Sequence, residues 1–251
     1  GYAQTDDKSE QTKAKTPAIK FSLIDLNGTI HSLEQNDSRR VRAFVFVSIE
    51  CPISNGYIKT LNGIQAMIAK SGKAAELFGV VSDPMVTRTQ AFKHFAEFKA
   101  EFPILFDSSG LLAQVLQPSH IPEAFVLDRD GKVVYRGAID NSWEAIGRRR
   151  PKAEKEFLSD AIMLASNDSS VVVSETKPVG CLFEMPLKGD AQSKVTYTRD
   201  IAPIIQTRCL NCHRDGQVAP FALTDYDQIA KRAKQIVRVT QDRIMPPWIP
   251  S

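Results

Sequence analysis

The most constraining feature of the sequence is the run VRAFVFVSI at residues 41–49, which is followed directly by Glu50, Cys51 and Pro52. Its β-branched and aromatic residues form an almost continuous apolar segment, which is typical of a central strand buried on both faces. Apolar residues then recur mostly at helical spacing over residues 53–71. We therefore expect a buried strand that carries Cys51 to the start of a helix.

Strand-like and helix-like segments alternate around this unit. Asn27 and Gly28 separate two strand patterns, and Asn-Gly supplies the positive φ angles of a tight hairpin. Strands are expected at residues 21–26, 29–33, 77–81, 104–106, 124–127, 133–135 and 171–173. Helices are expected at residues 87–102, 152–165, 200–209 and 226–240. This order predicts an α/β domain with a central mixed sheet flanked by helices, followed by a small all-α region.

The length of 251 residues, 43% of them apolar, favours two domains, each with a core. We expect them at residues 18–175 and 195–251, joined by a linker at residues 176–194. Residues 1–17 are polar and are expected to be a flexible tail or the remnant of a signal peptide. A net charge of +3 gives no nucleic-acid signal, and no apolar run is long enough to span a membrane.

The sequence CLNCH at residues 209–213 is the second informative feature. Cys-x-x-Cys-His is the spacing with which two thioethers hold a c-type haem while the adjoining histidine ligates its iron. A zinc half-site and a plain disulfide pair are the alternatives, but zinc needs further ligands, and the other histidines lie far upstream, at positions 31, 94 and 120. The motif predicts one covalent haem c held by Cys209, Cys212 and His213.

Met245 is the candidate for the second axial ligand, because it is the only Met or His after His213. A thioether ligand raises the haem potential and suits electron transfer. Pro246 and Pro247 stiffen the chain beside it. The alternative is that Met245 fills the core and that the sixth position is open or is filled by another molecule. The metal ligands that we expect are thus His213 and Met245.

Several stretches carry a family resemblance: VFVSIECPISNGYIKTLNGI, GVVSDP, IPEAFVLDRDGKVVYRGAID, AIGRRRP and SETKPVGC. Together they resemble bacterial redoxins of the alkyl hydroperoxide reductase/thiol-specific antioxidant superfamily, over about residues 18–183. Residues 195–248 resemble a cytochrome c-like module at the ends of exported bacterial proteins. The resemblance implies a thioredoxin-like domain fused to a small all-α cytochrome c-like domain.

The redoxin resemblance also implies a site around Cys51. The first free amides of a helix favour its thiolate, although an inert buried thiol is the alternative. Pro122 stands where thioredoxin-like folds carry a cis-proline facing the active-site cysteine. Ser54 replaces the second cysteine of a local Cys-x-x-Cys, which excludes dithiol exchange by that motif alone. Ser48 fits the hydroxyl position of the peroxiredoxin box, but Phe44 replaces its proline.

Cys181 is the remaining candidate for a partner of Cys51. The 130-residue separation is no obstacle to a disulfide once the fold brings the two sulfurs together. Two possibilities stay open, a Cys51–Cys181 redox pair and two separate thiols. The catalytic residues expected in this domain are therefore Cys51, Cys181, Pro122 and Ser48.

These observations predict an exported redox protein with a one-electron haem and a cysteine site for thiol–disulfide or peroxide chemistry. The alternative is a non-enzymatic electron-transfer subunit whose redoxin fold is a docking scaffold. Haem attachment to this motif takes place outside the bacterial cytoplasm, so we expect a periplasmic or otherwise exported protein. Related modules continue into a further helix, whereas this sequence stops at Ser251. We therefore expect a redox partner, a larger complex or a homo-oligomer to cover the haem edge.

Overall fold

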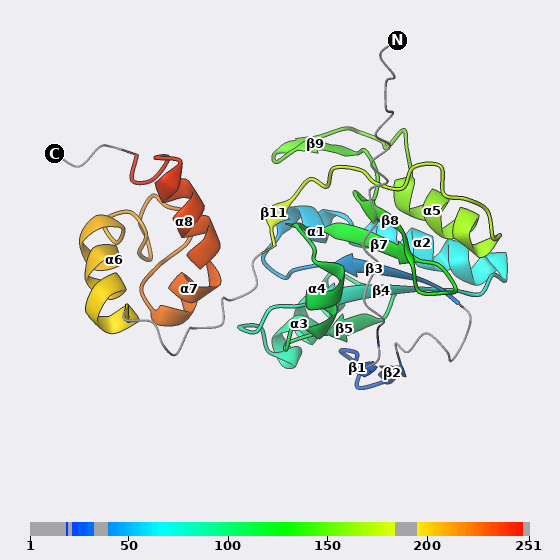
Figure 1. Ribbon diagram of the computed structural model, residues 1–251, viewed down its shortest axis with the longest axis horizontal. Helices are drawn as coiled ribbons and strands as arrows, with labels where there is room; N and C mark the ends of the chain where they lie inside the picture. Colours follow the sequence, from blue (N-terminus) through cyan, green and yellow to red (C-terminus); the bar gives the residue numbers. More distant parts are fainter. Residues whose placement is uncertain (1–18, 20–21, 33–39, 184–194, 248–251) are drawn as a thin grey trace, which may run out of the picture.

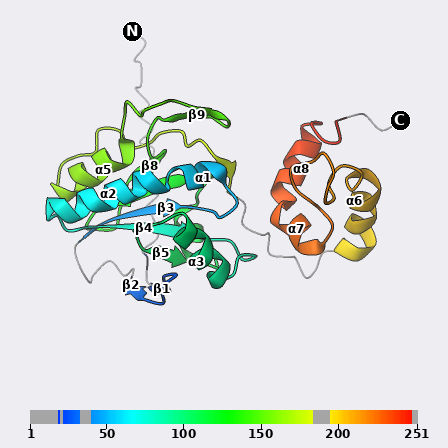
Figure 2. The same ribbon diagram turned by 180° about the vertical axis from the view of Figure 1, so that it is seen from behind.

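The computed structural model describes residue 19 and residues 22–32, 40–183 and 195–247 (Figure 1). They form an N-terminal unit, residues 19–183, and a C-terminal unit, residues 195–247, which lie side by side in both views (Figures 1 and 2). The expected tail at residues 1–17 lies outside the described residues, as does most of the expected linker. The domain boundaries therefore stay a prediction.

A five-stranded mixed sheet forms the centre of the N-terminal unit, in the order β5-β4-β3-β7-β8. Its strands are β3 (Val41–Phe46), β4 (Ala75–Val81), β5 (Ile104–Phe106), β7 (Glu123–Leu127) and β8 (Val133–Gly137). The first three run parallel, while β7 is antiparallel to β3 and β8 is antiparallel to β7. Every residue of β3 is buried, as its apolar run predicts.

Alternate side chains of β3 enter two apolar cores. Val41, Ala43 and Val45 pack with the helices α1 (Pro52–Gly56), α2 (Ile58–Ser71), α3 (Arg88–Glu97) and α5 (Phe157–Ser166). Phe44 and Phe46 belong to the other core, which includes α4 (Leu111–Leu116). Both faces of the sheet are thus covered, and the predicted α/β architecture with a flanked mixed sheet is confirmed.

Three predicted helices have different bounds. The helix expected at residues 53–71 is divided at Tyr57, whose hydroxyl donates to the buried carboxylate of Asp140 at 2.7 Å. The second, α3, ends at Glu97 rather than residue 102 because Lys99 adopts a positive φ of 56°. The third, α5, starts at residue 157 rather than 152, because the side chain of Asn141 accepts the N–H groups of residues 154 and 155 in a loop.

The expected hairpin is present: β1 (Ser22–Ile24) and β2 (Ile30–Ser32) pair antiparallel, with Gly28 at a φ of 95°. Short elements without a periodic pattern were missed, namely α4, β6 (His120–Ile121), β9 (Trp143–Ala145), β10 (Arg148–Arg149) and β11 (Cys181–Leu182). The expectation of a linker at residues 176–183 was wrong, because β11 pairs with β6. Residues 171–173, expected as a strand, form no regular element.

The C-terminal unit consists of η1 (Tyr197–Ile201), α6 (Ala202–Arg208), α7 (Tyr226–Lys231) and α8 (Ala233–Gln241). The helix expected at residues 226–240 is divided at Arg232 into α7 and α8. The unit buries three apolar side chains, those of Ile205, Leu223 and Ile229. Among the described residues, no helix combines the length and apolar character that a membrane span requires.

Candidate functional site

Cys51 lies at the N-terminus of α1, at the end of the loop that leaves β3. The residue is 2% exposed, and its Sγ lies 3.3 Å from the carbonyl oxygen of Ile121, to which it donates a hydrogen bond when the thiol is protonated. The Ile121–Pro122 peptide bond is cis, as the sequence predicts. The strand-loop-helix connection and the segment before β7 thus meet at this sulfur.

Cys181 is brought to the same place by strand pairing. In the antiparallel register of β11 and β6, Cys181 lies opposite Ile121. Its Sγ lies 3.4 Å from the Sγ of Cys51, and both cysteines are free. The structure therefore brings together the two thiols that the sequence could only nominate, one of them buried and the other exposed.

The pair is electrostatically unequal. The Cys181 thiol donates a hydrogen bond that lowers the pKa of Cys51 to about 6, and this effect outweighs the burial that raises it. The N–H groups of Ser54 and Ile53 at the start of α1 also lower it. The same hydrogen bond raises the pKa of Cys181 above its ordinary value. Cys51 is thus the thiolate of the pair at neutral pH, and Cys181 is the thiol.

Gly180 makes the close approach of β11 possible. A Cβ atom at this position would lie 2.0 Å from the carbonyl oxygen of Ile121 and 2.5 Å from its carbon. These atoms belong to the backbone that also contacts Cys51, so they have little freedom to move. No local sequence pattern marks the contact of Gly180 with Ile121.

A buried carboxylate anchors the other strand of this pair. Glu123 is 1% exposed, and its Oε2 accepts hydrogen bonds from the backbone N–H groups of Ser119 and His120. Its Oε1 accepts from the guanidinium of Arg136 at 2.9 Å. These bonds hold the backbone of β6, and so they fix the position of Ile121 beside the two sulfurs. Sequence reasoning missed this group.

Ser48 and Ser54 shape the loop before Cys51. The hydroxyl of Ser54 accepts the N–H of Ser48 at 3.1 Å, and the hydroxyl of Ser48 accepts the N–H of Glu50 at 3.1 Å. The peroxide-related role expected for Ser48 stays a prediction, and this hydrogen bond gives the hydroxyl a structural role. His120, whose pKa is lowered by burial, lies within hydrogen-bonding distance of the hydroxyl of Ser119.

The CLNCH segment follows α6 as a compact turn. The N–H groups of Cys212 and His213 both donate to the carbonyl oxygen of Cys209, at 3.1 and 2.9 Å. Both cysteines are half-buried and free. The Nδ1 of His213 lies 3.1 Å from the carbonyl oxygen of Phe221. Its Nε2 has no hydrogen-bond partner in the part of the chain that the structure describes.

Two further observations bear on the expected metal chemistry. No group of three or more His, Cys, Asp or Glu side chains that could hold a metal ion occurs within residues 22–32, 40–183 and 195–247. Met245 follows α8, its N–H donates to the carbonyl oxygen of Val239, and its side chain is 39% exposed. Its role as an iron ligand stays a prediction.

Comparison with known proteins shows a family match in this chain, since residues 14–136 match the AhpC/TSA family. The N-terminal unit is thus similar to redoxins of the AhpC/TSA family, and we call it the redoxin unit. Its expected thioredoxin-like fold, with a mixed central sheet, is thereby confirmed. The matched residues do not extend to the C-terminal unit, so they leave the expected cytochrome c-like fold untested.

Two solved structures with TM-scores above 0.5 agree with the fold of the redoxin unit. A hypothetical protein from Sinorhizobium meliloti 1021 is 22% identical with a TM-score of 0.55, and the match covers 67% of this chain and 92% of that one. An uncharacterized conserved protein from Geobacillus kaustophilus is 22% identical with a TM-score of 0.57, and the match covers 70% of this chain and 92% of that one. A putative thiol:disulfide interchange protein DsbE from Chlorobium tepidum is 24% identical with a TM-score of 0.47, and the match covers 61% of this chain and 95% of that one. No curated protein matches the chain significantly.

The ionisation of Cys51 can be measured by its rate of alkylation at different pH values. Because its pKa is lowered to about 6, we expect the rate to reach half of its maximum near pH 6 and to be constant above pH 7. Cys181→Ala removes the thiol that donates to Cys51, so the midpoint of the alkylation profile should rise toward the ordinary pKa of about 8.5. The alkylation rate at pH 7 should then fall by a factor of roughly ten or more. Peptide mass spectrometry separates Cys51 from the other cysteines.

Cys181→Ser is the matched control, because its hydroxyl can still donate to the Cys51 sulfur. Its alkylation profile should lie nearer to the wild-type profile than that of Cys181→Ala. Identical profiles in wild type and Cys181→Ala would show that the cysteine pair does not set the pKa of Cys51.

Gly180→Ala tests the approach of β11. Its Cβ cannot fit beside the Ile121 carbonyl, so we expect β11 to separate from β6, at a cost of about 1–3 kcal/mol in the free energy of unfolding. Oxidation of Cys51 and Cys181 to a disulfide should slow at least about tenfold. The control is Gly63→Ala on α2, where an added Cβ meets nothing within 4 Å. It should leave the oxidation rate unchanged and raise the free energy of unfolding by about 0.5–1 kcal/mol, because alanine is the better helix former. Wild-type oxidation by Gly180→Ala would contradict the strand-pairing argument.

Proposed function

We propose that the redoxin unit carries out thiol–disulfide exchange, with Cys51 and Cys181 as its redox pair. The distance of 3.4 Å between their Sγ atoms is the observation that carries the proposal. A disulfide has an S–S distance near 2.05 Å, so a movement of roughly 1.4 Å closes the bond. Cys181 supplies the second thiol that Ser54 cannot supply in the local motif.

Exposure and pKa divide the work between the two sulfurs. Cys181 is exposed and Cys51 is buried, so a substrate thiolate attacks the Sγ of Cys181 in the disulfide form. The S–S bond breaks and its electron pair goes to Cys51, whose thiolate is stabilised by the N–H groups of Ser54 and Ile53 at the start of α1. A second substrate thiolate attacks the mixed disulfide and releases Cys181, which takes up a proton. The substrate dithiol thereby loses two electrons, and the cysteine pair gains them.

The same electrostatics favour one direction of the reaction. Stabilising the Cys51 thiolate stabilises the reduced pair, which makes the disulfide a stronger oxidant. The substrate class is therefore an exposed dithiol that is oxidised to a disulfide. In this scheme Cys51 is the buried leaving group, whereas the sequence suggested the first attacking nucleophile.

Peroxide reduction has less support. Peroxide would have to reach the Sγ of Cys51, which is 2% exposed, and the Ser48 hydroxyl that could assist it accepts the N–H of Glu50. The exposed sulfur belongs to Cys181, whose pKa is raised and which is therefore a poor nucleophile at neutral pH.

Mixed-disulfide trapping with an oxidised peptide tests the roles of the two cysteines. Cys51→Ser should accumulate a mixed disulfide at Cys181, because the thiolate that resolves it is absent. Cys181→Ser should accumulate little, because Cys51 is buried. The oxidised wild-type protein should oxidise a peptide dithiol. The rate of this oxidation should be at least about 100-fold lower with either variant than with wild type. Trapping at Cys51 alone would reverse the roles, and full activity in both variants would remove the proposal.

We also propose that the C-terminal unit carries one haem c, with thioether bonds to Cys209 and Cys212 and with His213 as an iron ligand. Several features of the residues present fit this group. The compact turn gathers the two free thiols and the histidine within five residues. The contact of Nδ1 with the Phe221 carbonyl orients the ring and leaves Nε2 available, as is usual for metal-binding histidines. Exposed apolar residues of the unit, Val218, Val237 and Ile244, can cover a flat apolar group.

Met245 is the proposed second axial ligand, since it is the only thioether or imidazole after His213. When bound, such a haem supplies a one-electron carrier. The surrounding residues bind and orient it: the Phe221 carbonyl holds the histidine ring, and the buried Ile205 and Leu223 shape the apolar wall. With this group present, a redox protein partner or a larger electron-transfer assembly is the expected partner.

Expression in a host that matures c-type cytochromes tests the haem. The intact mass should rise by one haem, and the denatured protein should give a pyridine haemochrome spectrum. Cys209→Ser combined with Cys212→Ser should abolish both signals. Met245→Leu should keep the covalent haem but lose the sulfur-to-iron charge-transfer band, whereas the control Met85→Leu in the redoxin unit should keep the band. Bound zinc and no haem would refute this part of the proposal.

Export from the cytoplasm follows from both proposals. Disulfides form and persist in oxidising compartments, and covalent haem attachment to this motif takes place outside the bacterial cytoplasm. We therefore place the protein in the periplasm or an equivalent exported location.

A further inference from the structure

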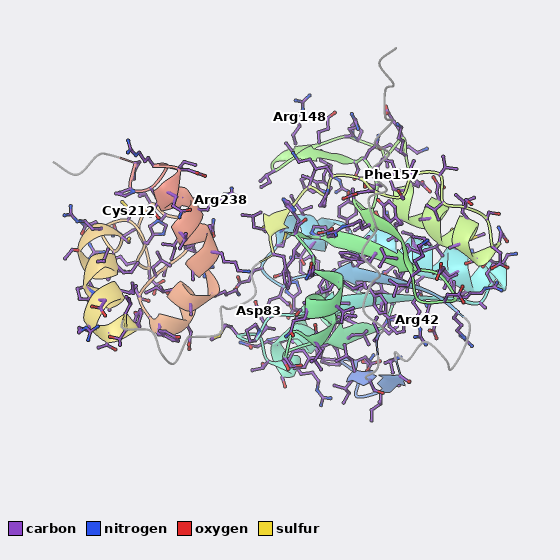
Figure 3. All side chains as sticks on the ribbon, in the orientation of Figure 1. Arg42, Asp83, Arg148, Phe157, Cys212 and Arg238 are labelled. Atoms are coloured by element: carbon purple, nitrogen blue, oxygen red, sulfur yellow. The ribbon has the colours of Figure 1, made fainter. Side chains whose placement is uncertain are left out.

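Basic side chains of the C-terminal unit meet acidic side chains beside the redox site. The Nζ of Lys231 lies 2.7 Å from Asp83 Oδ2 and 3.0 Å from Glu50 Oε2. Arg232, the next residue, lies 3.8 Å from the same Glu50 oxygen. Glu50 directly precedes Cys51, and Figure 3 shows Asp83 on the side of the redoxin unit that faces the C-terminal unit. The contact between the units is therefore adjacent to the buried thiolate.

The same basic residues lead to the CLNCH segment. The guanidinium of Arg232 lies over the ring of Phe221, 4.4 Å from its centre. The Phe221 ring lies 4.8 Å from the ring of His213, and the carbonyl oxygen of Phe221 contacts its Nδ1. A continuous series of side chains thus runs from Glu50 through Arg232 and Phe221 to His213.

A hollow of about 360 Å³ lies between the units, with Glu50 and Met85 on one side. The opposite side is lined by Ala222, Asp225, Asp227, Gln228, Lys231 and Arg232, so the basic pair lies beside two carboxylates of its own unit. In both ribbon views, α7 and α8 lie on the side of the C-terminal unit that faces the redoxin unit, and α6 lies farther away (Figures 1 and 2). The facing surface is the one that carries the basic pair.

We propose that Lys231 and Arg232 dock the C-terminal unit onto Glu50 and Asp83, so that this unit is the partner in cis of the Cys51–Cys181 site. The role of this unit as a partner of the cysteine pair rests on the proposed thiol–disulfide function, whereas the docking itself can be measured separately. The occupant of the acidic surface is the chain's own C-terminal unit, because its two adjacent cations match the two acids.

The docking is weak enough to be reversible. The side chains of Lys231 and Asp83 are 20% and 17% exposed, and such partly exposed ion pairs stabilise only modestly. They suffice because both units belong to one chain, which gives them an effective concentration of roughly millimolar. Salt screens such pairs, so the docked population should fall as ionic strength rises.

Zero-length carbodiimide cross-linking of the full chain tests the docking. We expect an amide between Lys231 and Asp83 or Glu50 within single molecules, with a yield at least about fivefold lower in 1 M NaCl. Lys231→Glu should increase the radius of gyration in X-ray scattering at low salt. Combining Lys231→Glu with Asp83→Lys exchanges the charges of the closest pair and should largely restore the compact value. Lys234→Glu on α8 makes the same change of charge outside the contact and should leave the radius unchanged.

Three outcomes would overturn the docking: no Lys231 cross-link, unchanged scattering in Lys231→Glu, or cross-links between copies in a mixture of ¹⁴N- and ¹⁵N-labelled chains. The last result would make a second copy the occupant. Dithiol oxidation measured on the same samples separates this inference from the proposed function. Docking without dithiol oxidation refutes the function alone, whereas dithiol oxidation without docking refutes the inference alone.

Discussion

The pairing of β11 with β6 is the interaction on which the redox site depends. Two residues of each strand are enough to place Cys181 opposite Ile121, whose carbonyl oxygen also contacts the Cys51 sulfur. The pairing tolerates no side chain at position 180, and the buried carboxylate of Glu123 fixes the strand on the other side. The geometry of the cysteine pair is thus set by backbone contacts rather than by a local cysteine motif.

This arrangement explains how a redoxin with Ser54 at the second motif position can still have two thiols. Ser54 is fully buried, and its hydroxyl supports the loop that carries Ser48 and Cys51. The second thiol comes from a segment 130 residues later, and it is the exposed one of the pair. Access and acidity therefore belong to different sulfurs, because the exposed sulfur is not the one whose pKa is lowered.

Sequence patterns predicted the features that local interactions decide. The apolar run of β3, the Asn27–Gly28 hairpin and the helix start after Cys51 are each specified by neighbouring residues. The division of the following helix at Tyr57 was missed, because it accompanies a hydrogen bond to Asp140, 83 residues away. The contact of Lys231 with Glu50 joins residues 181 positions apart, and β11 is too short to have a period. These long-range contacts leave no periodic signal in the sequence.

The position of Cys181 near the end of the redoxin unit has a mechanical consequence. β11 is the last described strand before the chain continues to the C-terminal unit. In the reduced protein this exit segment is held by a two-residue pairing, one thiol hydrogen bond, and the contacts of Phe183 with Ser119 and Phe46. A disulfide between Cys51 and Cys181 would add a covalent bond between this segment and the start of α1. The oxidation state of the two sulfurs therefore determines whether the chain is fastened covalently or only by noncovalent contacts where it leaves the redoxin unit.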